Sequence, residues 1–236
     1  MTDSALRELA DDPSSRKRFF KMLGGAGAVS AFSVALAACG DDDDKKSSST
    51  PAPAASGETD NAEKDNKSDL KILNYALTLE YLEAEFYAKV IDSGLVKDAK
   101  VVAIAKKFGS TEQEHVDALK ATIEKLGGTA VSAPKTKFQP TLDKGLMAVL
   151  QTAAEVENLG AAAYLGQAGK IKNKEVLAAA LAIHTVEARH AAALNILVGR
   201  GFGDGKGGLK GALPDGAFAK PMDMAAVLAA VKPFLA

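Results

Sequence analysis

The sequence predicts an all-α fold, in which four long helices form two hairpins that are joined by one long crossover. From Asp69 onward, apolar residues recur at steps of three and four, which is the period of an amphipathic helix and not of a strand. Short breaks at Gly94 and Gly169 each separate two helices of a hairpin, whereas a longer break with two prolines runs from 127 to 141. Two hairpins and one long crossover are a known connectivity of four-helix bundles.

The segment before the bundle, 1–38, has the features of a bacterial export signal. A basic segment at 15–21 precedes an apolar run of about 15 small residues at 24–38, which is too short to span a membrane comfortably. The run ends in Leu-Ala-Ala-Cys-Gly, which resembles a lipobox with Cys39 as the lipidated residue. The basic segment resembles a twin-arginine signal except that Lys17 stands in place of the second arginine, so the twin-arginine and general secretory routes both stay open.

Residues 39–68 are expected to be a disordered tether between this signal and the bundle. From Gly40 to Ser68 the chain holds no Val, Ile, Leu, Met or aromatic residue, so little can offset the entropy of ordering it. The acidic run Asp41–Asp44 is a solvated spacer or, less favoured, a calcium site. The protein is therefore expected to be an exported lipoprotein, anchored outside the cytoplasmic membrane or in the periplasm or outer membrane.

The bundle itself is expected over 69–200, followed by a glycine-rich tail and a short closing helix within 201–236. The four helices are expected at 69–94, 97–126, 142–169 and 173–199, and the closing helix at 222–236.

The composition sets limits on function. With 29 Lys and Arg against 30 Asp and Glu, the chain lacks the basic excess of a nucleic-acid-binding protein. A single Cys excludes a disulfide framework and a zinc finger, and three His look few for a metal enzyme.

Each helix nevertheless carries one glutamate near the middle of its apolar stripe. These residues are Glu80, Glu112, Glu157 and Glu187. A carboxylate in a core costs several kcal/mol unless it is paired, neutralised or bound to a metal ion. One such residue on each of four helices suggests a shared centre.

A repeat of two motifs sharpens this interpretation. Glu-x6-Tyr is followed by Glu-x-x-His in each hairpin, first at Glu80, Tyr87, Glu112 and His115 and again at Glu157, Tyr164, Glu187 and His190. Residues three apart share a helix face, so both side chains of a Glu-x-x-His pair can reach one centre.

The sequence therefore predicts a centre of two iron or two manganese ions inside the bundle. The expected ligands are Glu80, Glu112, His115, Glu157, Glu187 and His190. Tyr87 and Tyr164 are expected to donate hydrogen bonds to ligands or to act as nearby redox-active groups.

Other polar residues near the stripes have two readings. Glu83 is an extra ligand or, more favoured, a residue at the rim of the core. His184 contacts the ligands or, more favoured, is a core histidine whose hydrogen bonds are satisfied. Glu85, Glu114 and Glu155 fall off the stripes and are expected in solvent.

Two segments resemble a known family. Ala-Leu-Thr-Leu-Glu-Tyr-Leu-Glu-Ala-Glu-Phe-Tyr at 76–87 and Val-Glu-Ala-Arg-His-Ala-Ala at 186–192 are similar to the ferritin-like domain family often found in exported bacterial proteins, some of them called desiccation-related. The similarity covers about 69–235. It implies a ferritin-like four-helix fold with a dinuclear site and says less about function.

Two functions follow as expectations. The first is an envelope-anchored redox protein that acts on O₂ or peroxide, either a di-iron oxidase or peroxidase or a di-manganese, catalase-like enzyme. The second is a non-enzymatic metal-binding or stress-protective bundle with a structural metal site. Expected partners are a membrane, through the lipid on Cys39, and a small oxidant. A closed iron-storage shell fits poorly with a tether on every subunit, but a homodimer is compatible with it.

Overall fold

The computed structural model of this chain describes residues 57–203, 211–214 and 216–236, with side chains from Glu63 onward. The predicted signal at 1–38, Cys39 and the run Asp41–Asp44 lie outside the described residues. Within the described part the chain forms six α-helices and one short 3-10 helix, and no strand. The all-α prediction is therefore confirmed. None of these described helices is both long and apolar enough to cross a membrane.

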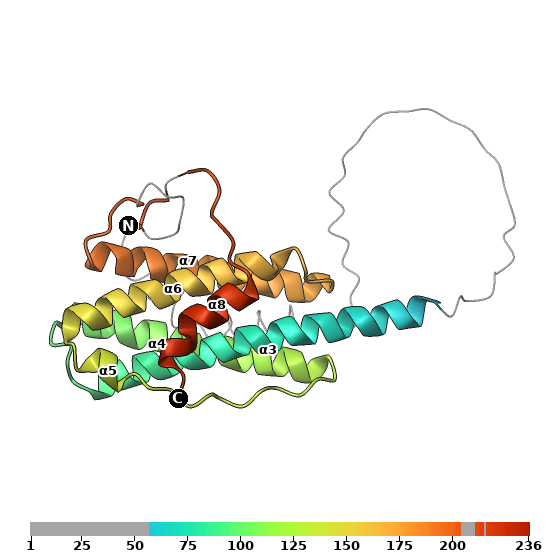
Figure 1. The fold of residues 1–236 in the computed structure, drawn as a ribbon, viewed down its shortest axis with the longest axis horizontal. Coiled ribbons are helices and arrows are strands. Elements are labelled where there is room, and N and C mark those ends of the chain that lie inside the picture. Colours follow the sequence, from blue (N-terminus) through green and yellow to red (C-terminus); the bar gives the residue numbers. More distant parts are fainter. Residues whose placement is uncertain (1–56, 204–210, 215) are drawn as a thin grey trace, which may run out of the picture. The chain divides into compact units, whose positions relative to one another are not determined.

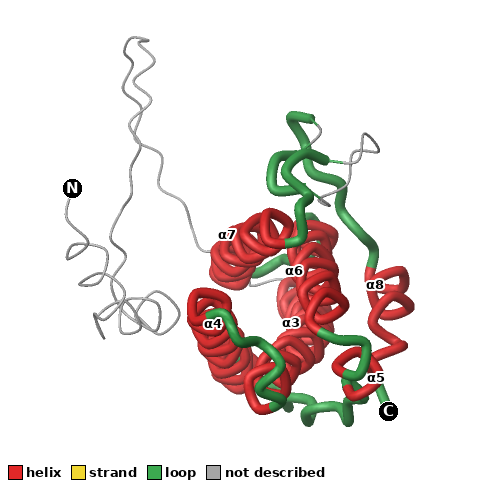
Figure 2. Tube along the Cα trace, turned by 90° about the vertical axis from the view of Figure 1, so that its left-hand side faces the viewer, coloured by secondary structure: helices red, strands yellow, loops and turns green. Residues whose placement is uncertain are grey.

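Four long helices make the bundle. They are α3 (Gly57–Asp92), α4 (Ala99–Lys125), α6 (Leu146–Ala168) and α7 (Lys174–Leu197). Short connections turn α3 and α4 into one antiparallel hairpin and α6 and α7 into another (Figure 1). The end-on view of Figure 2 shows all four helices around a common centre. The predicted pair of hairpins is thus confirmed.

Side-chain caps start two of these helices where the sequence breaks them. Oδ1 of Asp98 accepts hydrogen bonds from the backbone N–H of Lys100 and Val101 at the start of α4. Asn173 does the same for the first turn of α7. These oxygens satisfy N–H groups that have no partner within the helix, which explains why both second helices begin just after a short turn.

The first helix differs from the prediction at its start. α3 begins at Gly57, twelve residues before the expected start at 69, so the prediction of disorder was wrong for 57–68. A helix that is already nucleated by its buried stripe extends at low cost, because each added residue gains a hydrogen bond. Asn66, which lies in the added part of the helix, also holds it against α4, since its Nδ2 donates a hydrogen bond to the carbonyl of Leu126 at 3.0 Å.

The crossover is held by the C-terminal end of the chain. It contains a helical turn that the sequence did not predict, α5 (Gln139–Leu142). The N–H of Lys137 donates to the carbonyl of Phe234 at 2.9 Å, and the N–H of Ala236 donates to the carbonyl of Lys135 at 2.9 Å. The crossover and the C-terminal end, about a hundred residues apart in sequence, are therefore joined by backbone hydrogen bonds in both directions.

α6 starts at Leu146 and not at the expected 142, because Gly145 has a φ of 91°, which interrupts the helix. The closing helix is also shorter than the expected 222–236. It consists of α8 (Met224–Val231) and the 3-10 turn η1 (Lys232–Phe234).

α8 packs on the outside of the bundle beside α6 (Figure 2). Val227 and Val231 are its buried residues. The N–H of Met222 donates to the carbonyl of Ala162 at 3.0 Å, which fixes the approach of this segment to α6.

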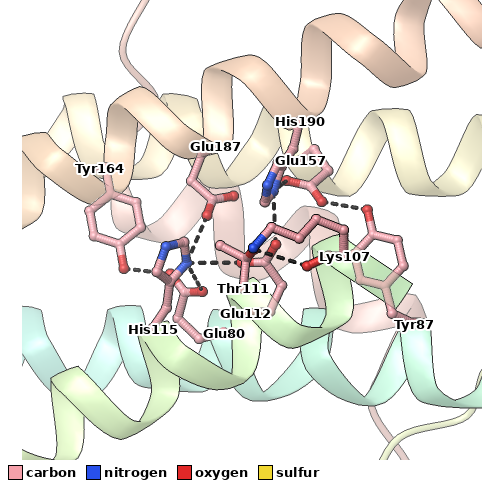
Figure 3. A network of polar contacts seen from close by, with 10 residues as sticks. All are labelled: Glu80, Tyr87, Lys107, Thr111, Glu112, His115, Glu157, Tyr164, Glu187 and His190. Atoms are coloured by element: carbon pink, nitrogen blue, oxygen red, sulfur yellow. Dashed lines mark hydrogen bonds and ion pairs between the residues drawn. The ribbon is translucent and has the colours of Figure 1, made fainter. Parts of the chain in front are cut away.

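The apolar core is divided into two clusters. Tyr87 and Phe86 belong to one cluster, with residues of α6 and α8, and Tyr164 and Ile123 belong to the other. A group of polar side chains lies between the rings of Tyr87 and Tyr164 (Figure 3). The fold therefore places a polar layer between two apolar layers.

Gly166 tests how α8 docks. A Cβ at this position would lie 1.8 Å from the carbonyl oxygen of Met222, whereas a Cβ at Gly169 would meet nothing within 4 Å. We expect Gly166→Ala to lower the free energy of unfolding by about 1–3 kcal/mol, because the docked backbone must move away. Gly169→Ala, the control, should be neutral or stabilise by about 0.4–1 kcal/mol. Urea unfolding followed by circular dichroism measures both, and equal effects would contradict the docking.

Candidate metal centre

Four glutamates, one from each bundle helix, are sealed inside the protein at the same level. Their exposed fractions are 0% for Glu80, Glu112 and Glu187 and 1% for Glu157. They are the residues that interrupt the four apolar stripes, so the helical period of the sequence brings them together. Acidic groups this deeply buried need compensation from nearby positive charge.

His115 supplies part of that compensation. Its Nδ1 lies 2.9 Å from Oε2 of Glu112. The same nitrogen lies 3.1 Å from Oε2 of Glu80 and 3.1 Å from Oε1 of Glu187. A ring nitrogen carries at most one hydrogen, so it cannot bond to three carboxylates. Only the contact with Glu80 has the geometry of a hydrogen bond. The convergence is that of donor atoms around a cation.

His190 occupies the equivalent place in the second hairpin. Its Nδ1 lies 2.8 Å from Oε1 of Glu112 and 3.3 Å from Oε2 of Glu157. Glu112 therefore directs one oxygen to each imidazole and stands between them (Figure 3). The ring of Phe108 stacks on His190, with centroids 3.8 Å apart, and holds the orientation of this imidazole.

The six residues form two overlapping groups that can each hold a metal ion. Glu80, Glu112, His115 and Glu187 make one group, and Glu112, Glu157, Glu187 and His190 make the other. Within each group the donor atoms lie within 4.8 Å of one another. Glu112 and Glu187 belong to both groups, so each of them can contribute a ligand atom to either group. Each group also has one glutamate and one histidine of its own.

The two tyrosines fix the unshared glutamates, and each crosses to the other hairpin to do so. The phenol of Tyr164 on α6 donates to Oε1 of Glu80 on α3 at 2.5 Å. The phenol of Tyr87 on α3 donates to Oε1 of Glu157 on α6. In both cases the other carboxylate oxygen, Oε2, is left to face a histidine. The tyrosines thereby orient one carboxylate in each group.

Burial and the neighbouring charges shift the pKa values of the four buried glutamates. Burial raises the pKa of Glu80 and of Glu157, and burial together with the charge of Glu112 raises that of Glu187 well above 4.5. Burial also acts on Glu112, but the attraction of two imidazoles outweighs it and lowers the pKa to about 2.

For the two histidines, burial and the neighbouring charges act on the pKa in opposite directions. Burial alone would lower their pKa values, but the neighbouring carboxylates raise the pKa of His190 to about 9 and that of His115 further still. Burial and the carboxylates also raise the pKa of Tyr87 and Tyr164 well above 10.0, so both phenols stay neutral donors.

The remaining sequence candidates lie elsewhere, with one exception. Nδ1 of the half-buried His184 is 2.9 Å from the carbonyl oxygen of Ala161, so this histidine has a backbone partner and belongs to neither group. Glu85 and Glu155 pair with Lys89 and Arg200 at the surface. Glu114 belongs to neither group.

The exception is Glu83, whose placement at the rim of the core was wrong. It is only 2% exposed, because it lies one turn beyond Glu80 on the same buried face of α3. Sequence reasoning also missed Gly160, which the structure places against Glu187 and Glu83. The repeat could have revealed this pair, because Gly160 follows Glu157 as Glu83 follows Glu80.

Comparison with known proteins agrees with this geometry. Residues 68–200, more than half of the chain, match a family model described as a ferritin-like domain. The matched segment contains all four long helices from residue 68 on and all six residues of the two groups. No curated protein matches the chain.

The pKa shifts predict how the stability of the metal-free protein depends on pH. The raised carboxyl pKa values contribute stability that is complete below pH 4.5 and is lost as the pH rises. The stability from His190 is complete below pH 6.5 and is lost as the pH rises through about 9. The stability from Glu112 is complete above pH 4.5 and is lost as the pH falls towards about 2.

We therefore expect the melting temperature in the presence of a chelator to fall from about pH 5 to about pH 9 and also to fall below about pH 4. Circular dichroism melts at each pH measure this. Glu155→Gln, which removes a surface carboxylate, should leave the profile unchanged. A melting temperature that is constant or rises between pH 5 and pH 9 would contradict these protonation states.

Proposed function

The chain belongs to the ferritin-like domain family, and from this premise we propose that it binds two iron or two manganese ions and uses them in redox chemistry with O₂ or peroxide. The observation that carries the proposal is the pair of overlapping groups that share Glu112 and Glu187. Two shared carboxylates suit two adjacent cations, because each carboxylate offers two oxygens.

The donor set favours these metals. Each group has three carboxylates and one imidazole and contains no thiolate, a set of hard and borderline ligands that suits iron and manganese better than a structural zinc ion. The four carboxylates balance the charge of two divalent ions when both imidazoles are neutral. Both oxygens of Glu112 and of Glu187 lack a hydrogen-bond partner among the described residues, so these atoms remain available as ligands.

The protein's own residues would prepare the centre for such chemistry. When bound, a pair of redox-active ions supplies the electrons and the binding position for a small oxidant. Tyr87 and Tyr164 hold Glu157 and Glu80 in place from opposite sides. The stacked ring of Phe108 shields His190 from solvent. Water is excluded by the apolar clusters on both sides of the polar layer.

A non-enzymatic protein with a structural metal site is the second candidate. The complete burial of the shared carboxylates favours it, because ions bound there would join all four helices and offset the cost of burying the glutamates. In that case the metal stabilises the fold but turns over no substrate.

The sequence before the bundle adds a proposed location. The basic segment, the apolar run and Cys39 support export and lipid anchoring at the cell envelope. The segment 40–56 would then act as a spacer that holds the bundle away from the membrane, with a small oxidant reaching it from outside.

Metal content tests the central proposal. The full chain, reconstituted with Fe²⁺ or Mn²⁺ and then desalted, should carry about two ions per chain. The variant with both Glu112→Ala and Glu187→Ala should bind neither ion, because each group loses two carboxylates. A matched control with Glu85→Ala and Glu155→Ala removes two surface carboxylates and should bind as the original chain does. Fewer than about 0.2 ions per original chain, by elemental analysis, rejects the proposal.

Turnover separates the two candidate functions. If the protein is a redox enzyme, the metal-loaded chain consumes peroxide or O₂, and the variant without Glu112 and Glu187 does not. If the site is structural, loading raises the melting temperature of the original chain, no turnover is found, and the same double variant loses only the thermal shift.

Lipid anchoring is tested at Cys39. In a bacterial host with a lipoprotein pathway, we expect the full chain to partition into the detergent phase of a membrane extract, and Cys39→Ser to move it to the aqueous fraction. The bundle variant with Glu85→Ala and Glu155→Ala should partition like the original chain. Partition of Cys39→Ser into detergent would contradict an anchor at this residue.

A further inference from the structure

The internal repeat is broken at one position next to the centre. Glu80 and Tyr87 on α3 recur as Glu157 and Tyr164 on α6, with the same spacing of seven. Three residues after Glu80 the chain has Glu83, but three residues after Glu157 it has Gly160. A fifth carboxylate on one side thus faces a residue with no side chain on the other.

The two positions lie together in space. A Cβ on Gly160 would lie 3.0 Å from Oε1 of Glu83 and 2.9 Å from Oε2 of Glu187. Both oxygens therefore point to the same spot beside α6, and these two distances put them within about 6 Å of each other. Any larger residue at 160 would push into this space, so glycine allows Glu83 to approach Glu187, which belongs to both groups.

The carboxyl group of Glu83 is buried without full compensation by hydrogen bonds. Its side chain is 2% exposed, and its Oε2 has no hydrogen-bond partner among the described residues. Its other oxygen, Oε1, is the one that lies beside Oε2 of Glu187, a residue of both metal-binding groups. A buried carboxyl oxygen without a partner costs stability, which a bound cation would offset.

We propose that Glu83 is a fifth carboxylate ligand of the metal centre and reaches it beside Glu187, through the space that Gly160 leaves open. This proposal rests on the metal-binding function proposed above. It gives one side of the centre a ligand that the repeat does not supply on the other.

The stability of the metal-free protein distinguishes a ligand role of Glu83 from a purely structural role. Burial of the Glu83 carboxyl group beside other carboxyl groups costs free energy in the metal-free protein, so a neutral replacement of the same shape should stabilise the metal-free fold. The same replacement should weaken metal binding. A residue that only supports the fold would instead lower stability when it is replaced.

Titration of Co²⁺ into the chelator-treated full chain, followed by visible absorption, tests the proposal. We expect Glu83→Gln to weaken Co²⁺ binding by about tenfold, to change the shape of the visible band because the ligand set changes, and to raise the metal-free melting temperature. Glu85→Gln is the matched control, since it removes a surface carboxylate two residues along the same helix. It should change the affinity by less than about twofold.

Gly160→Ala provides a second variant that keeps every carboxylate. It should also weaken Co²⁺ binding, and combining it with Glu83→Gln should cost less than the sum of the two changes, because both act on the same space. Unchanged affinity and an unchanged band in Glu83→Gln, with the original chain binding Co²⁺ normally, overturn the role of Glu83 alone. Failure of the original chain to bind Co²⁺ overturns the proposed function itself.

Discussion

The burial of glutamates at one level of a helical bundle is the constraint on which the rest of this structure depends. Carboxylates in an apolar core repel one another and lose their hydration, and two imidazoles offset only part of this cost. The two apolar clusters must therefore provide enough stability to hold a polar layer between them. The C-terminal segment adds packing and backbone hydrogen bonds to α6 and to the crossover.

The internal repeat explains how the chain meets this constraint. Each hairpin alone supplies three of the four residues of one metal-binding group, and the fourth comes from the other hairpin: Glu187 completes the group of Glu80 and His115, and Glu112 completes that of His190. The tyrosines cross in the same way, so each hairpin orients a carboxylate of the other. The centre therefore exists only when the two hairpins pack in the correct register. A cation would therefore bind only to the correctly assembled bundle, and its binding would stabilise that assembly.

The sequence predicted what depends on periodicity within one helix. The spacing of three in Glu112 and His115 and the position of each glutamate in its stripe are local, and the structure brings all six residues together. Relations between helices were not accessible in the same way. Which carboxylate each tyrosine contacts, and the close approach of Gly160 to Glu83, are set by packing across the bundle. The start of α3 was missed because polar residues can continue a helix that packing elsewhere has nucleated.

The repeat is imperfect, and its differences fall around the centre. Phe108 stacks on His190, whereas the corresponding position in the second hairpin is the smaller Ile183. His115 faces three carboxylates and His190 faces two, so the pKa of His115 is raised further. Glu83 places a further carboxyl group beside Glu187, and the corresponding position on α6 is Gly160, which has no side chain. Ions bound in such a centre would therefore have different surroundings in its two halves, although the two Glu-x-x-His motifs are alike: the internal repeat sets the ligand positions, and the residues that depart from it set what surrounds them.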